Sequence, residues 1–204
     1  MNAPIIAISR HRMITDGDGV TTLVGFYGCP LRCKMCLNSV CFDPDVKRTL
    51  YTPQQLYDKL AVDNVYFMAT GGGVTFGGGE PLLYPDFIRE FADIVKGDWQ
   101  INIETSLNVP WESVKTVAAV ADSFIIDIKT ADPDIYRAYT GKDNGAVIDN
   151  LKRLFETFPA DRVRVRIPLI TGFNDKGDII KSRELLKTLG AVNFDIFKYR
   201  IKEL

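Results

Sequence analysis

The chain has 204 residues, of which 46% are hydrophobic and 25% charged, a composition typical of a globular protein with one sizeable core. Its 25 basic and 26 acidic residues are evenly mixed and leave a net charge of −1, which predicts neither nucleic-acid binding nor attachment to an anionic membrane. No stretch approaches the ~20 apolar residues of a membrane span, and the apolar run before Arg10 is too short for a signal peptide. We therefore expect a cytoplasmic protein.

Short runs rich in β-branched residues alternate with longer segments of helical period along the whole chain. The expected strands are 21–27, 73–77, 100–106, 123–129, 162–169 and 193–199, and the expected helices are 52–62, 84–97, 111–122, 147–158 and 178–190. This alternation predicts right-handed βαβ units and a parallel sheet. A closed barrel of eight units usually needs ~250 residues, so a doubly wound sheet and an incomplete barrel of six units both fit. With no linker or repeat, residues 1–204 are expected to form a single domain.

In either architecture ligands bind at the carboxyl ends of the strands, where this chain places most of its polar and metal-binding groups. Three cysteines follow the first strand, and a glycine-rich segment ending at Glu80 follows the second. The remaining groups lie at the ends of the next three strands and are Glu104, Thr105, Asp127, Lys129 and Arg166. We expect all of them to lie close together.

The cysteines have the spacing C-x3-C-x2-C at Cys29, Cys33 and Cys36, with Cys41 further along. In a reducing compartment such a cluster indicates metal binding or redox chemistry rather than disulfides. Two kinds of site remain open: a structural zinc held by four thiolates, or an iron–sulfur cluster held by three thiolates that leaves one iron free. The only histidine, His11, is expected in a loop without a catalytic role, which disfavours Ser/His/Asp and two-histidine zinc sites.

The other strand ends also have alternative interpretations. The glycines at 77–79 allow the backbone to approach a ligand closely, but no Lys-Ser/Thr follows them, so they do not form a phosphate loop. Asp127 and Lys129 alternate with isoleucines and should share one strand face, as ligand-binding groups or as a structural ion pair. Arg162, Arg164 and Arg166 should likewise share a face, with Arg162 solvated.

The cysteine motif is accompanied, in order, by the segments "GGGVTFGGGEPLL", "IET", "FIIDIK" and "RIPLITGFND". Together they resemble the radical S-adenosylmethionine (SAM) superfamily and, within it, the glycyl-radical-enzyme activating enzymes. The resemblance extends from about residue 16 to residue 198. It implies an incomplete (β/α)6 TIM-like barrel with one 4Fe-4S cluster, at which SAM is reductively cleaved to a 5′-deoxyadenosyl radical. The radical would abstract hydrogen from a glycine of a partner glycyl radical enzyme.

The resemblance also assigns roles to the residues at the strand ends. Cys29, Cys33 and Cys36 would be the cluster ligands. The residues expected to bind SAM or lie beside it are Gly78, Gly79, Glu80, Glu104, Thr105, Asp127, Lys129 and Arg166. A monovalent or divalent cation is possible near Glu104 and Asp127, because relatives bind one at the corresponding strand ends.

The chain departs from the family pattern at several positions. Leu37 stands where relatives often have a histidine, and Cys41 is extra and is expected to take no part. The lack of further cysteines predicts that there is no ferredoxin-like insert. We expect a monomer that accepts electrons from a flavodoxin- or ferredoxin-type donor and binds neither nucleic acid nor membrane. The alternatives are a radical SAM enzyme acting on another peptide or small molecule, and a zinc-stabilised binding protein that uses all four cysteines.

Overall fold

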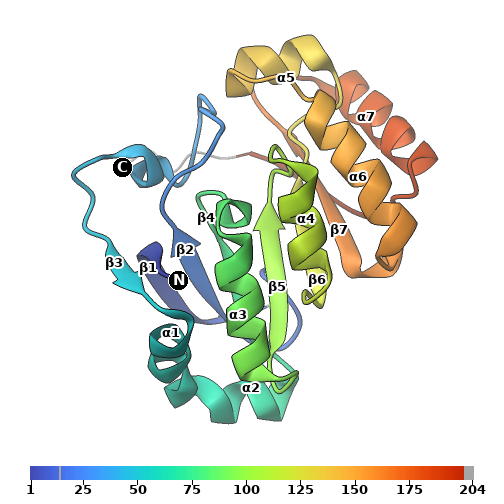
Figure 1. Ribbon diagram of the computed structural model, residues 1–204. Coiled ribbons are helices and arrows are strands. Elements are labelled where there is room, and N and C mark those ends of the chain that lie inside the picture. Colours follow the sequence, from blue (N-terminus) through green and yellow to red (C-terminus); the bar gives the residue numbers. More distant parts are fainter. Residues whose placement is uncertain (14, 200–204) are drawn as a thin grey trace.

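The fold is organised around one curved sheet, shown in Figure 1 in a computed structural model that describes residues 1–13 and 15–199. Its strands follow the order β3-β1-β2-β4-β5-β6-β7-β8. Their bounds are β1 Ala3–Met13, β2 Val20–Phe26, β3 Thr49–Tyr51, β4 Gly73–Gly78, β5 Gln100–Thr105, β6 Ser123–Asp127, β7 Val163–Leu169 and β8 Asn193–Lys198.

From β2 to β8 every neighbouring pair of strands is parallel. The crossovers between them contain the helices, as βαβ units require. Within the described residues β3 and β8 are the two edges of the sheet, and they do not pair with each other. The sheet is therefore curved but not closed, which confirms the incomplete (β/α)6 barrel.

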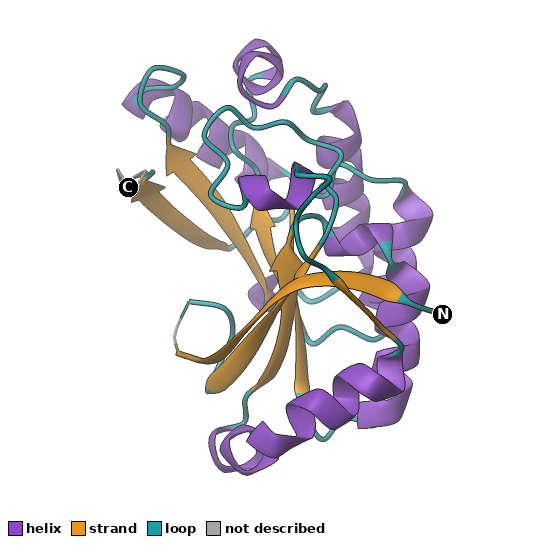
Figure 2. Ribbon diagram, turned by 90° about the vertical axis from the view of Figure 1, so that its left-hand side faces the viewer, coloured by secondary structure: helices purple, strands orange, loops and turns teal. Residues whose placement is uncertain are grey.

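The helices cover the outer, convex face of the sheet, and Figure 2 shows them along one side of the strands. Several begin with strong capping signals: Thr52 and Gln55 form a capping box at the start of α1, and Asp175 and Asp178 form one at the start of α7. No helix among the described residues is long and apolar enough to cross a membrane. Their bounds are α1 Pro53–Leu60, α2 Asn64–Thr70, α3 Pro85–Val95, α4 Trp111–Ala118, α5 Pro133–Thr140, α6 Gly145–Thr157 and α7 Lys176–Thr188.

The N-terminal edge of the sheet differs from the prediction. β1, which was not expected, pairs antiparallel with β2 and with β3, so the prediction of a wholly parallel sheet is wrong at this edge. β1 contains two register shifts, and its residue His11 has a left-handed backbone with φ 55°. His11 therefore lies in a strand rather than a loop, and its ring lies 3.2 Å from the buried carboxylate of Asp63. Irregular, half-exposed strands of this kind lack a clean period-2 pattern.

The helices α2 and α5 were not predicted from the sequence either.

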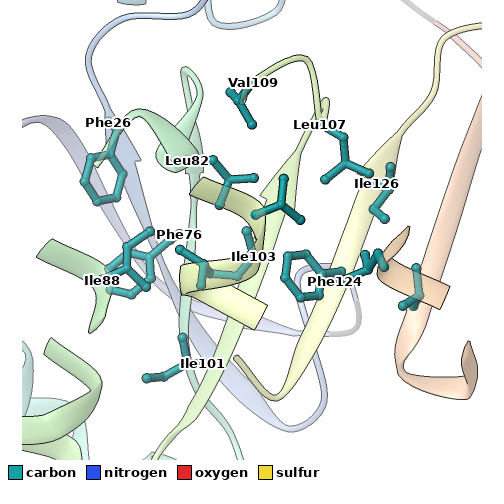
Figure 3. Close-up of a cluster of buried hydrophobic side chains, with 14 of the residues drawn as sticks. Phe26, Phe76, Leu82, Ile88, Ile101, Ile103, Leu107, Val109, Phe124 and Ile126 are labelled. Atoms are coloured by element: carbon teal, nitrogen blue, oxygen red, sulfur yellow. The ribbon is translucent and has the colours of Figure 1, made fainter. Parts of the chain in front are cut away.

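The hydrophobic core lies between the sheet and the helices, because alternate strand residues point to opposite faces. Figure 3 shows the side chains of Phe76, Ile103 and Phe124 in this layer, and none of the three is exposed to solvent. Ile88 of α3 packs against the same layer. Polar strand residues occupy the concave face, including Glu104, which lines a cavity there. The fold thus leaves its concave, helix-free face for a site.

Candidate active site

A cavity of about 420 Å³ lies at the carboxyl ends of the parallel strands. The structure places every residue that the sequence predicted for the site in the lining of this one cavity. These residues are Cys29, Cys33, Cys36, Gly78, Gly79, Glu80, Glu104, Thr105, Asp127, Lys129 and Arg166. The expectation that they lie close together is confirmed.

The three cysteines lie on the loop of residues 28–38, which we call the cysteine loop. Backbone N–H groups of Arg32 and Lys34 donate to the carbonyls of Thr140 and Tyr139, at 2.9 and 3.0 Å. Tyr139 and Thr140 are the last two residues of α5, so the end of this helix holds the cysteine loop in place. The loop is anchored by its own backbone, so its side chains remain available to face the cavity.

The thiols of the loop differ in their electrostatic surroundings. Burial and, to a smaller extent, the nearby Glu80 carboxylate raise the pKa of Cys29 to about 12. Burial likewise raises the pKa of Cys33. The influence of the neighbouring Cys41 thiol instead lowers the pKa of Cys36 to about 6. Cys41 is also buried, and its expected lack of a role stays a prediction.

Gly78, the last residue of β4, and Gly79, which follows it, are needed because two backbone segments lie in direct contact here. Gly78 has φ 85°, and a Cβ added to it would lie 2.6 Å from the Cα of Gly25. A Cβ on Gly79 would lie 2.1 Å from the carbonyl oxygen of Gly28, an impossible contact. The Glu80 N–H also donates to that oxygen, at 2.8 Å. Only glycines let the end of β4 pack against the start of the cysteine loop.

The side chain of Glu80 is 1% exposed and accepts four hydrogen bonds. Its Oε1 accepts from the Thr105 hydroxyl at 2.7 Å and from the Leu82 N–H at 3.2 Å. Its Oε2 accepts from Ser106 through the N–H at 3.0 Å and the hydroxyl at 2.7 Å. Burial raises the pKa of this carboxyl above its usual value, although the hydrogen bonds oppose the shift. Glu80 therefore ties the end of β4 to the end of β5.

Lys129 and Asp127 form the ion pair that the sequence pattern suggested, with Nζ to Oδ2 at 2.9 Å. The geometry differs from the prediction, because β6 ends at Asp127 and Lys129 follows it with a left-handed φ of 66°. Burial alone would lower the pKa of the Lys129 ammonium, but Asp127 and Cys33 more than offset this and raise it above its usual value. Lys129 therefore carries a positive charge into the cavity at neutral pH.

Arg166 lies among three carboxylates at the cavity wall. Its Nη1 contacts Glu104 and lies 3.8 Å from Oδ1 of Asp127, and its Nε lies 3.7 Å from Oδ2 of Asp195. Burial would lower the pKa of this guanidinium, but Glu104 above all raises it. Within the described residues the buried Nε has no hydrogen-bond partner. Arg166 thus occupies the space between the two acids where a cation was expected.

The arginines at 162, 164 and 166 do not line one cavity. Arg164 and Arg166 alternate with buried residues along β7 and therefore lie on one face of the strand, as predicted. Arg162 precedes the strand, in the short 3-10 helix η4 (Ala160–Arg162), and is exposed, as expected of it. Arg162 and Arg164 line a separate cavity of about 470 Å³ at the opposite ends of the strands. Of the three, Arg166 is therefore the one that reaches the predicted site.

Several residues of the cavity were not found from the sequence. The Tyr199 hydroxyl donates to the carbonyl of Met35 in the cysteine loop, at 2.7 Å. The Asn38 side chain donates to the carbonyl of Gly78, at 3.0 Å. Neither residue was assigned to the site from the sequence. Among residues 1–13 and 15–199, no three side chains of His, Cys, Asp or Glu converge closely enough to hold a single metal ion.

The cysteine loop also borders a second hollow on its outer side, of about 360 Å³. Cys33 and Cys36 line both this hollow and the main cavity. The charged residues around the outer hollow are Arg32 and Lys34, and both are exposed. Cys33 and Cys36 therefore lie between the main cavity and the outer hollow.

Comparisons with known proteins agree with this geometry. The radical SAM superfamily model matches residues 23–186. The (2S)-3-sulfopropanediol sulfolyase activating enzyme of Bilophila wadsworthia is 27% identical, over 91% of this chain and 82% of its own length. The pyruvate formate-lyase-activating enzyme of Clostridium pasteurianum is 33% identical, over 88% of this chain and 74% of its own. The structure of TYW1 with a lysine-pyruvate adduct superimposes with a TM-score of 0.68 at 20% identity, over 90% of this chain and 66% of that one.

Proposed function

This chain belongs to the radical SAM superfamily, and we propose that it activates a glycyl radical enzyme by abstracting hydrogen from a glycine of that partner. The proposal rests mainly on one cavity, which the three loop cysteines line. The same cavity is lined by glycines, acidic residues, a lysine and an arginine from the ends of four neighbouring strands. The activating enzymes among its relatives support the choice of reaction.

The donor set fits a 4Fe-4S cluster, which the superfamily implies. Three thiolates from one irregular loop can hold three irons of a cube and leave the fourth for a substrate. Cys29, Cys33 and Cys36 would hold it, since all three line the cavity. When bound, such a cluster supplies the electron that cleaves SAM to a 5′-deoxyadenosyl radical. The protein contributes binding, orientation and exclusion of water.

SAM carries an ammonium, a carboxylate and a sulfonium, and the cavity offers partners for the first two. We assign the carboxylate to the Lys129 ammonium, which Asp127 positions. Because four protein donors already use the Glu80 carboxylate, the segment from Gly78 to Glu80 would meet the SAM ammonium through its backbone carbonyls. Arg166, Glu104 and Thr105 would form the wall beside it.

The cation expected near Glu104 and Asp127 remains a prediction. Arg166 contacts Glu104 and lies within 3.8 Å of Asp127, so its guanidinium supplies positive charge at the same place. A cation would have to bind beside this guanidinium or displace it.

The electron donor would act from the outer hollow, because Cys33 and Cys36 are the thiols that reach it. An acidic flavodoxin- or ferredoxin-type protein would suit this surface, because the basic residues Arg32 and Lys34 flank the hollow. The cytoplasmic location, the monomeric state and the lack of nucleic-acid or membrane partners also remain predictions.

The glycine of the partner would reach the cavity through the open side of the barrel, between the edge strands β3 and β8. The test is to mix the reduced, cluster-loaded protein and SAM with purified glycyl radical enzymes under anaerobic conditions. We expect a glycyl doublet by electron paramagnetic resonance with a cognate partner, and none with Cys33→Ala. SAM cleavage driven by a different peptide or small molecule, without a doublet from any partner, would favour radical SAM chemistry on another substrate.

A further inference from the structure

The last strand, β8, has one free edge: in the part of the chain that the structure describes it pairs with β7 alone, in parallel. The N–H of Tyr199, which directly follows β8, donates to the carbonyl of Leu169 in β7 at 2.9 Å. Backbone groups of successive residues point to opposite edges of a strand, so those of Phe197 point toward β7 as well. The N–H and C=O groups of Ile196 and Lys198 therefore point away from the sheet.

The free edge of β8 runs along the main cavity. The side chains of Phe197 and Tyr199 line that cavity, and the Asp195 carboxylate lies 3.7 Å from Nε of Arg166 at its wall. Ile196 points to the other face of the strand and is 46% exposed. An exposed strand edge offers a row of backbone donors and acceptors to which an extended chain can pair. The cavity is therefore continuous with a surface that can bind a peptide through its main chain.

We propose that β8 receives the glycine-bearing segment of the partner enzyme as an added strand, hydrogen-bonded to the backbone of Ile196 and Lys198. The inference rests on the proposed function, in which a peptide enters through the open side of the barrel that β8 borders. Every second residue of a strand paired there faces the concave side, next to Phe197 and Tyr199. A glycine at such a position lies beside the cavity and has no side chain to block the approach to its Cα hydrogens.

A second copy of the chain is the other candidate to cover this edge. Two copies paired at β8 would close the open side of both barrels, because β8 and β3 are its two borders. The proposed reaction needs that side open to a peptide, so the partner segment is the occupant that agrees with the position of the edge.

The first experiment measures amide hydrogen exchange in the cluster-loaded protein with SAM, resolved to single residues by mass spectrometry with electron-transfer fragmentation. The probes are synthetic peptides that contain the radical-bearing glycine of candidate glycyl radical enzymes. We expect a bound peptide to slow exchange at the amides of Ile196 and Lys198. The amide of Phe197, which already pairs with β7, should exchange slowly with and without peptide and is the internal control.

The second experiment compares the affinity of two variants for the same peptides, measured by fluorescence anisotropy. Ile196→Pro removes the outward N–H and leaves the bonds to β7 intact, since proline is tolerated where an edge N–H faces solvent. Ile196→Val keeps the N–H and is the matched control. Thermal melting followed by circular dichroism establishes that both variants are folded. We expect Ile196→Pro to bind the peptide at least roughly fivefold more weakly and to cleave SAM without peptide at the wild-type rate.

Equal affinity of folded Ile196→Pro and the wild type would overturn the inference, and so would peptide binding that leaves the Ile196 amide unprotected. Both results leave the proposed function standing. Protection of this amide in the free protein would also overturn the inference, because a second copy or another segment of the chain would then cover the edge; analytical ultracentrifugation distinguishes these two. If no glycine peptide binds the wild type, the proposed function and the inference fail together.

Discussion

Glu80 and Ser106 are joined by two hydrogen bonds, from the Ser106 N–H at 3.0 Å and from its hydroxyl at 2.7 Å. The pair connects the ends of β4 and β5, and β4 ends in the glycines that pack against the start of the cysteine loop. Glu80, which was expected to bind a ligand, therefore also holds the two strand ends together.

Replacing Glu80 by alanine should therefore destabilise the fold even before SAM is added. Buried donors from Thr105, Ser106 and Leu82 would lose their acceptor. Since each of these four buried donors left without a partner costs ~1–3 kcal/mol, we expect a loss of at least about 4 kcal/mol in the free energy of unfolding. Urea denaturation of the cluster-free protein measures it. The exposed Glu156→Ala is the control and should change stability little; equal stability of the two variants would contradict the structural role.

Lys129→Met should weaken SAM binding by roughly tenfold to a hundredfold, since a hydrogen bond to a charged group contributes about 1.5–3 kcal/mol. The measurement is calorimetric titration of the cluster-loaded protein with SAM, with the exposed Lys142→Met as control.

Among residues 1–13 and 15–199, removal of Lys129 also leaves Asp127 with the more distant Arg166 as its one ion-pair partner. The double variant Lys129→Met/Asp127→Asn should therefore regain stability without regaining SAM affinity. Recovery of both properties would show that Lys129 acts only as the partner of Asp127.

Tyr199→Phe should loosen the cysteine loop, because it removes the hydroxyl that donates to the Met35 carbonyl at 2.7 Å. A neutral hydrogen bond contributes about 1 kcal/mol, so the loop should open roughly fivefold more often. We expect faster bleaching of the cluster in air, followed by visible absorbance. Tyr66→Phe, on the exposed part of α2, is the control. Equal bleaching rates would mean that the contacts from α5 hold the loop without Tyr199.

The stability of α7 should depend on pH through Asp175. Hydrogen bonds, first from the Asp178 N–H, lower the pKa of this carboxyl below its usual value. A lowered folded-state pKa means that the stabilisation is present above the unfolded pKa of about 3.9 and is lost as pH falls through the folded value. Asp175→Ala should therefore lower the melting temperature at pH 7, and the difference should shrink in acid below that window. Asp175→Asn keeps the capping acceptor, so its melting temperature should fall less. If the difference between the wild type and Asp175→Ala did not change with pH, the charge of Asp175 would play no part in capping α7.

Much of this architecture could be predicted because it depends on local patterns. The apolar alternation of the parallel strands reports which face is buried, and the carboxyl ends of such strands necessarily meet at one edge of the sheet. That rule is sufficient to bring Cys33, Glu104 and Arg166 to one cavity. Strand β1 escaped detection because its bulges and half-exposed residues leave no regular period.

The side-chain partners could not be predicted, because they join residues far apart in the chain. Glu80 and Ser106 are 26 positions apart, and Tyr199 and Met35 are 164 apart. Such pairs follow from how the strand ends and loops pack in three dimensions.

The most direct test of the account is to reconstitute the protein anaerobically, reduce it, add SAM and quantify both iron and 5′-deoxyadenosine. The account predicts a brown protein with about four irons per chain, as expected for one 4Fe-4S cluster, which cleaves SAM. Cys29→Ala, Cys33→Ala and Cys36→Ala should each lose both properties, and Cys41→Ala should keep its iron. A colourless protein that holds one zinc through all four cysteines and leaves SAM intact would contradict it.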